Sequence, residues 1–303
     1  MSWNDDLEKA TEEFKSIVCM GIDPDQEKIE KSMGLEKGKL NPKIHLVEFY
    51  EDILDEMEKE ATMPAAAKTN YAFFARFGRD GLHALGELSD IINGKKIPWI
   101  LDGKRGDIKN TGIAYAEEMF KVWGAGAITV NPYMGTDNVE PFTKWVNEED
   151  KEDKGGRGVY VLVRTSNPGA KDFQDLVLKD GRKVYEVVLE KTLEWGNSVP
   201  NDVGGVVGAT SVPELYDIMQ KVGEYNPNIP ILIPGVGKQG GTGYEVANGI
   251  VKYKLNAKKQ RVNSSRALNY AKLEDPEAKT SGEASVKNLK KLNTDIAKGG
   301  VKL

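Results

Sequence analysis

Eight short apolar runs recur along this chain, separated by longer stretches with the periodicity of amphipathic helices. Runs that are continuously apolar and rich in Val and Ile are typical of parallel strands covered on both faces. Apolar residues spaced three or four positions apart are typical of a helix with one buried face. The runs cover residues 16–23, 64–70, 97–102, 127–133, 158–166, 203–210, 229–237 and 260–268, and the helical stretches include 45–60, 81–93, 112–124, 184–196, 212–223 and 245–254.

The alternation of eight strands with helices predicts an α/β fold, the (β/α)8 TIM barrel. A doubly wound sheet would also alternate, but it typically has fewer strands and a glycine-rich first turn. The first turn here reads GIDPDQEK over residues 21–28 and lacks the G-x-G-x-x-G fingerprint. Because the composition shows no break at mid-chain, we expect one barrel domain over residues 1–303.

The segments outside this alternation also carry expectations. Residues 3–15 form a helix that either caps the other end of the barrel or lies beside the first strand, and 282–298 form a closing helix. The charged run 145–158 is predicted to be a solvated insertion. The turn-rich segment 167–183 follows a strand on the side where barrel enzymes carry functional loops, so it is either a lid or an ordinary connection.

Composition narrows the classes of function. Lys and Arg number 42 against 47 Asp and Glu, a net charge of −5, so no general attraction to nucleic acid or anionic membranes is expected. The single cysteine, Cys19, permits no intrachain disulfide, and with only two histidines a Cys/His zinc site is not expected. The acidic N-terminal segment is unlike a signal peptide, and no apolar run is long enough to span a membrane. We therefore expect a soluble, cytoplasmic protein.

Polar side chains stand where the apolar runs end, and in a barrel these ends converge on one mouth. Within LDGKRGDIKNT (101–111), Asp102 and Lys104 point to the same side because side chains alternate along a strand. Lys68 ends the preceding strand and could lie beside them, where burial would shift their pKa values. The alternative is a charged turn with weak surface ion pairs. The strand-end residues are Asp23, Lys68, Asn70, Asp102, Lys104, Asp107, Asn131, Ser166, Gln239 and Arg266.

Glycine-rich turns at 233–241 and 262–267 end the last two strands. Such turns, opening a helix with free backbone N–H groups, are the usual phosphate site of these barrels. Gln239 and Arg266 would add a neutral donor and a bidentate cation. The alternative is ordinary turn glycines with a surface arginine.

The pattern D-x-K-x-x-D-I-x-x-T, from Asp102 to Thr111, resembles the signature of the orotidine 5′-phosphate decarboxylase family. Other segments resemble the same family, in its order, from residue 16 to about 268: GIDPD, the strand-ending Lys68, TSNPGA, PGVG-x-QGG and SSRA. TSNPGA, VNPYMGTD and the length are similar to the longer branch of the family. Lys238 departs from the pattern, since a small residue is more usual there.

The resemblance implies decarboxylation of orotidine 5′-phosphate to uridine 5′-phosphate in de novo pyrimidine synthesis, without metal or cofactor. Lys104 would protonate C6, Asp102 would lie against the substrate carboxylate, and Lys68 would orient Asp102. Asp107 would reach the ribose of the other subunit's substrate, which implies a homodimer with shared sites. The resemblance further implies that Asp23 and Thr111 bind ribose, Ser166 the pyrimidine, Gln239 and Arg266 the phosphate, and that Asn70, Asn131 and Gly240 also bind substrate.

Two other functions remain open from the residues. A Mg²⁺-dependent sugar-phosphate decarboxylase or aldolase of the same barrel group shares the D-x-K-x-x-D motif, but it would be expected to carry an acid where Lys68 stands. The second alternative function is that of a phosphate-binding scaffold without catalysis. The presence of both Asp102 and Lys104 argues against it.

Overall fold

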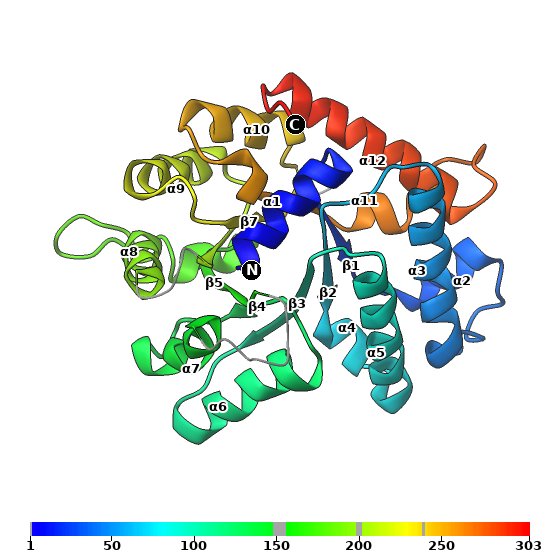
Figure 1. Ribbon diagram of the computed structural model, residues 1–303, viewed down its shortest axis with the longest axis horizontal. Coiled ribbons are helices and arrows are strands. Elements are labelled where there is room, and N and C mark those ends of the chain that lie inside the picture. The colour runs from blue at the N-terminus through cyan, green and yellow to red at the C-terminus, as the bar shows by residue number, and fades with distance from the viewer. Residues whose placement is uncertain (1, 148–155, 198–201, 238–239) are drawn as a thin grey trace.

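The computed structural model describes residues 2–147, 156–197, 202–237 and 240–303. Eight parallel strands close into a barrel in chain order, each paired with the next and the last with the first (Figure 1). This confirms the predicted (β/α)8 barrel. The strands are β1 (Val18–Ile22), β2 (Ala66–Asn70), β3 (Trp99–Arg105), β4 (Ala127–Val130), β5 (Gly158–Arg164), β6 (Val203–Val207), β7 (Ile231–Ile233) and β8 (Arg261–Ser264).

Helices surround the barrel, and each predicted helical stretch is found within a few residues of its expected bounds. The helices are α1 (Trp3–Phe14), α2 (Gln26–Met33), α3 (Pro42–Lys59), α4 (Tyr71–Ala75), α5 (Gly78–Gly94), α6 (Lys109–Glu117), α7 (Thr136–Asn147), α8 (Val184–Gly196), α9 (Val212–Tyr225), α10 (Gly243–Lys252), α11 (Arg266–Asn269) and α12 (Ser281–Lys298). A π-helical turn, Glu118–Val122, continues α6. The additional helices α2 and α4 mean that the alternation is less strict than the sequence predicts.

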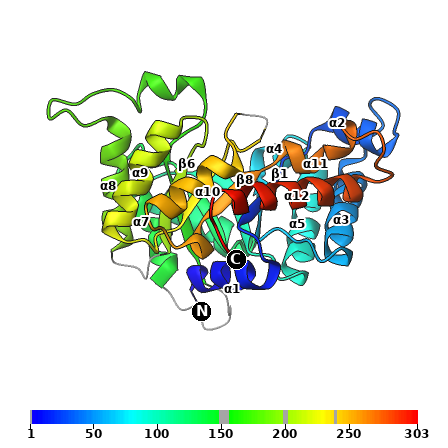
Figure 2. The same cartoon turned by 90° about the horizontal axis from the view of Figure 1, so that it is seen from above.

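Helix α1 closes the amino-terminal end of the barrel (Figure 2). Of the two expected positions for this helix, it therefore takes the one that caps the barrel and not the one beside the first strand. Its Trp3 and Leu7 are buried with inward residues of the strands, such as Cys19 and Tyr160. The Trp3 indole N–H donates to the Tyr160 hydroxyl at 3.1 Å. The guanidinium of the fully buried Arg261 donates to the Leu7 carbonyl at 2.6 Å. This plug leaves the opposite end of the barrel to hold a ligand.

Two predicted connections differ from their expected form. Helix α7 continues through Asn147, so the charged segment predicted at 145–158 begins inside a helix, and its residues 148–155 lie outside the described residues. The segment 167–183 starts with a 3-10 turn, Pro168–Asp172, and is closed by an antiparallel bridge between Val177 and Lys183. It stands at the carboxyl end of the strands (Figure 2), and its role as a lid remains a prediction.

Within the described part of the chain, no helix has the length and apolar character needed to cross a membrane.

Candidate active site

A pocket of about 480 Å³ opens at the carboxyl ends of the strands. Every strand of the barrel, or the residue directly after it, contributes to its wall. This is the end at which barrel enzymes place their chemistry, because the loops that follow the strands converge there. The contributions from β1 to β8 in order are Asp23, Lys68, Asp102, Thr129, Leu162, Val206, Leu232 and Asn263.

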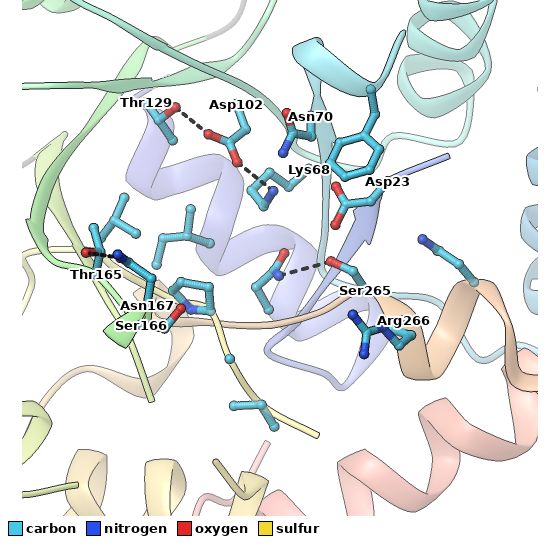
Figure 3. Close-up of a pocket in the computed structure, with 18 of the residues that line it drawn as sticks. Asp23, Lys68, Asn70, Asp102, Thr129, Thr165, Ser166, Asn167, Ser265 and Arg266 are labelled. Carbon is cyan, nitrogen blue, oxygen red and sulfur yellow. Dashed lines mark hydrogen bonds and ion pairs between the residues drawn. The ribbon is translucent and has the colours of Figure 1, made fainter. Parts of the chain in front are cut away.

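Asp102 is the centre of the charged part of the pocket. Its Oδ2 atom lies 2.8 Å from Nζ of Lys68, and its Oδ1 atom lies 2.7 Å from Nζ of Lys104. The Thr129 hydroxyl also donates to Oδ1 at 2.7 Å (Figure 3). The expected grouping of Lys68, Asp102 and Lys104 is therefore present in the structure.

The charges of this cluster are mutually stabilised. Burial acts to raise the pKa of Asp102, but the positive charges of Lys68 and Lys104 outweigh it and hold that pKa well below its ordinary value. Burial acts to lower the pKa of Lys68, but the negative charges of Asp102 and Asp23 outweigh it, so that pKa is raised. The pair is therefore ionised throughout the neutral pH range.

Strand β3 changes register where it carries the two charged residues. Leu101 pairs with Ile128 and Arg105 with Val130, so four steps along β3 match two steps along β4. Lys104 lies in this irregular stretch with a φ of 45°, a left-handed conformation that is strained for a residue with a side chain. Strand β3 extends to Arg105, beyond the expected end at residue 102. Asp102 and Lys104 still face the same pocket, as the alternation predicts.

The ends of β1, β2 and β5 supply further polar groups to the pocket. The Oδ1 atom of Asp23 is buried and, among the described residues, accepts no hydrogen bond. Asn70 and Ser166 also line the pocket. Gly21 allows the close approach of the residue that follows β8, because a Cβ atom there would lie 1.9 Å from the Ser265 hydroxyl oxygen.

Arg266 lies on the opposite side of the pocket from Asp102 and Thr129 (Figure 3). It is exposed, and no acidic residue of the described ranges forms an ion pair with it. Gly235 and Val236, from the turn after β7, line the same pocket. A cation beside a glycine-containing turn suits an anionic group. Gln239 and Lys238, which the sequence singles out here, lie outside the described residues.

Four predicted residues do not line the pocket of this chain: Asp107, Thr111, Asn131 and Gly240. The Asp107 carboxylate accepts from the backbone N–H of Ile108 at 2.8 Å, and the Asn131 side chain accepts from that of Tyr133 at 3.1 Å. Thr111 and Gly240 are exposed. Their roles stay predictions, and that of Asp107 requires a second subunit.

Several pocket residues were not anticipated, and the most informative is Thr129. It stands in the apolar run AITV, but it shares a strand face with Ala127, which belongs to the inner cluster of the barrel. Alternation along the strand could therefore have placed it in the mouth. The same reasoning applies to Asn263, two residues after the inward Arg261. The other unanticipated residues include Asp25, Lys28, Phe73, Thr165, Asn167, Ser265, Asn269 and Tyr270.

The chain is similar to proteins of one family. Residues 16–281 match the model described as the orotidine 5′-phosphate decarboxylase / HUMPS family, and this range contains all eight strands. A protein of Haloarcula marismortui named orotidine 5′-phosphate decarboxylase is 40% identical over 258 residues, covering 84% of this chain and 82% of the relative. A protein of the same name from Halorubrum lacusprofundi is 37% identical, covering 96% and 98%. The structure of Leishmania donovani OMP decarboxylase has a TM-score of 0.73 and 29% identity, covering 98% of this chain and 100% of that one.

Proposed function

The chain belongs to the orotidine 5′-phosphate decarboxylase family and converts orotidine 5′-phosphate to uridine 5′-phosphate in pyrimidine synthesis, and we propose that Lys104, Asp102 and Lys68 carry out the reaction. The observation that carries this proposal is the placement of two ammonium groups, at 2.7 and 2.8 Å, on one buried carboxylate in the pocket. The proposal requires neither a metal nor an organic cofactor.

The difficult step is the loss of carbon dioxide from C6 of the pyrimidine. The C6–carboxylate bond breaks, and its electron pair stays on C6 as a vinyl carbanion that no adjacent carbonyl delocalises. A fixed ammonium beside this charge is the most direct stabiliser available to the protein. Lys104 then gives its proton to C6. Its side chain is 49% exposed before substrate binds, so the resulting amine can regain a proton from water after product leaves.

Asp102 would face the substrate carboxylate and repel it before the bond breaks. Two carboxylates about 4 Å apart repel by about 4 kcal/mol at an effective dielectric constant near 20. At about 1.36 kcal/mol for each power of ten, this supplies only a few powers of ten in rate. We therefore assign the larger share to stabilisation of the carbanion by Lys104 and the second role of Asp102 to holding that ammonium in place.

The phosphate would bind remote from C6, at Arg266 and the turn after β7. Binding energy gained there stabilises the transition state when it orders the site around the reacting carbon. The segment 167–183, which follows β5, would close over the ligand and exclude water. Asp23 and Asn70 would bind the ribose, and Ser166 the pyrimidine.

The remaining proposals concern the whole protein. We assign residues 1–303 to one barrel domain that acts as a cytoplasmic homodimer, in which Asp107 reaches the ribose at the partner's site and Thr111, Asn131 and Gly240 also bind substrate. The position of Asp107 outside the pocket of its own chain supports this arrangement. The burial of the lone Cys19, which raises the pKa of its thiol to about 12, fits a protein that does not depend on disulfides.

A spectrophotometric assay of orotidine 5′-phosphate, with and without EDTA, tests the proposal. We expect turnover by the wild type that is unchanged by the chelator and lost in the Lys104→Ala variant. Loss of activity with EDTA would favour the Mg²⁺-dependent sugar-phosphate reaction instead. Binding of uridine 5′-phosphate without any change in the absorbance of orotidine 5′-phosphate would indicate a scaffold without catalysis.

A further inference from the structure

Thr129 joins the two charged residues of β3 through one hydroxyl group. We propose that Thr129 is a positioning residue for the decarboxylation, which fixes the carboxylate of Asp102 and the backbone of Lys104 in one geometry. The inference rests on the roles proposed above for these two residues, and it adds to them a residue that touches neither the C6 carbon nor the phosphate.

The hydroxyl acts in two directions. Its oxygen accepts the backbone N–H of Lys104 at 2.9 Å, and its proton is donated to Oδ1 of Asp102 at 2.7 Å. Because one side must accept while the other donates, the two partners fix the orientation of the hydroxyl. A valine of the same shape could make neither bond.

The position of Thr129 on β4 matches the place where β3 is irregular. It lies between Ile128 and Val130, opposite the stretch of β3 from Leu101 to Arg105 that breaks the regular pairing. Within that stretch the N–H of Lys104 donates to this side chain at 2.9 Å. The side chain thus links β3 to β4 inside the irregular stretch. It also supports the strained left-handed backbone of Lys104, whose φ is 45°.

The consequence for catalysis concerns the Lys104 ammonium. Oδ1 of Asp102 accepts hydrogen bonds from both Nζ of Lys104 and the Thr129 hydroxyl, so Thr129 holds the acceptor to which the ammonium is bonded. Thr129 also holds the backbone N–H of Lys104 itself. The side chain of Lys104 is half-exposed and long, and packing alone gives it little restraint. Fixing both the backbone of Lys104 and the carboxylate that accepts its ammonium therefore defines the position of the proton donor.

The test compares Thr129→Val, which removes the hydroxyl, with Thr129→Ser, which retains it. We expect Thr129→Val to lower kcat by roughly 10- to 100-fold, as a small misplacement of a catalytic group does. The KM for orotidine 5′-phosphate and the affinity for uridine 5′-phosphate should change less than about threefold, because the phosphate and ribose contacts are untouched. Thr129→Ser should restore most of kcat.

Thr192→Val is the matched control. Thr192 is as buried as Thr129, but it stands on α8 and donates to the Val188 carbonyl, away from the pocket. We expect it to keep the wild-type kcat, even if the loss of a buried hydrogen bond lowers its melting temperature. If Thr129→Val does not fold, Thr129→Ala removes the hydroxyl with less crowding and takes its place.

The outcomes separate this inference from the proposed function. A kcat for Thr129→Val within threefold of the wild type, while Lys104→Ala is inactive, overturns the positioning role and leaves the function standing. Equal losses in Thr129→Val and Thr129→Ser also overturn it, because then the hydroxyl is not the cause. A wild type that does not decarboxylate orotidine 5′-phosphate would instead overturn the function itself.

Discussion

The ammonium of Lys68 and the carboxylate of Asp102 form an ion pair of 2.8 Å that is almost completely withdrawn from water. Burial penalises each charge, yet each pKa moves in the direction that keeps the group ionised, because the partner's charge outweighs the loss of hydration. The pair is therefore interdependent: removing either member leaves a buried charge with less compensation.

Replacing Lys68 by Met should lower the free energy of unfolding by about 3 kcal/mol, because the Asp102 charge loses one of its two cations. The double variant Lys68→Met/Asp102→Leu should lose less stability than the single variant, since it buries no charge at this position. Urea denaturation of the two variants and the Asp102→Leu variant measures the coupling. Strictly additive losses would mean that the two groups do not stabilise each other.

Lys104→Ala should abolish turnover while the fold persists. The side chain is half-exposed, so its removal costs little packing, but it removes the cation beside the developing carbanion. We expect kcat to fall by at least about 1,000-fold, at the upper end for loss of one stabilising donor. Binding of uridine 5′-phosphate and the melting temperature report on the fold. Lys59→Ala, which removes an exposed lysine at the end of α3, is the control. Turnover of Lys104→Ala within tenfold of the wild type would contradict the proposed role.

Arg266→Ala should weaken ligands that carry a 5′-phosphate by roughly 10- to 100-fold, as expected for the loss of a charge-assisted hydrogen bond. The affinity for uridine, which lacks the phosphate, should change little. Calorimetric titration with uridine 5′-phosphate and with uridine separates the two effects. Arg79→Ala removes an exposed arginine on α5 and serves as the control. Equal losses for both ligands would show that Arg266 does not act on the phosphate.

The barrel could be predicted from the sequence because its strands are covered on both faces and therefore read as continuous apolar runs. The pairing of Lys68 with Asp102 followed from the same alternation, since both stand at the ends of neighbouring strands. Helix α7 was not among the predicted helical stretches. Pro141 lies inside it and lacks the backbone N–H that a helix interior uses. The local sequence pattern does not show that packing of α7 against the barrel compensates for the missing hydrogen bond at Pro141.

The site was less predictable than the fold for two physical reasons. At the irregular stretch of β3 a side chain of β4 accepts the backbone N–H of Lys104, and the apolar appearance of AITV conceals this hydroxyl of Thr129. The role proposed for Asp107 requires a second subunit, and no pattern within one chain gives the geometry of another chain. Residues proposed to act within one barrel were therefore easier to place than a residue proposed to act between two barrels.

Hybrid dimers test the shared site. If Asp107 acts on the partner's substrate, Asp107→Ala and Lys104→Ala homodimers are each inactive, but a mixed dimer contains one pocket with both residues intact. Mixing the two variants should restore up to roughly a quarter of the wild-type activity, since random exchange makes half of the dimers mixed and each has one complete site. Subunit exchange is verified with differently tagged chains. Exchange without recovery of activity would mean that the site is complete within one chain.

The stability of the barrel's closed end should depend on pH through Asp202. Its carboxylate is buried beneath α1 and accepts the backbone N–H of Asn4 at 2.8 Å. Burial outweighs this hydrogen bond and raises the pKa of Asp202 to about 6. Since the folded state binds the proton more tightly than the unfolded state, the group stabilises the fold below pH 4, and this contribution is lost as the pH rises through 6.

Asp202→Asn keeps an acceptor for the Asn4 N–H but cannot ionise. The difference between a pKa near 4 and one near 6 corresponds to roughly 3 kcal/mol at neutral pH. The free energy of unfolding of the variant, relative to the wild type, should therefore fall by about this amount between pH 7 and pH 4, with most of the change between pH 6 and pH 4. Urea denaturation of both proteins at several pH values measures it. A relative stability that stays constant over this range would show that burial does not raise the pKa of Asp202.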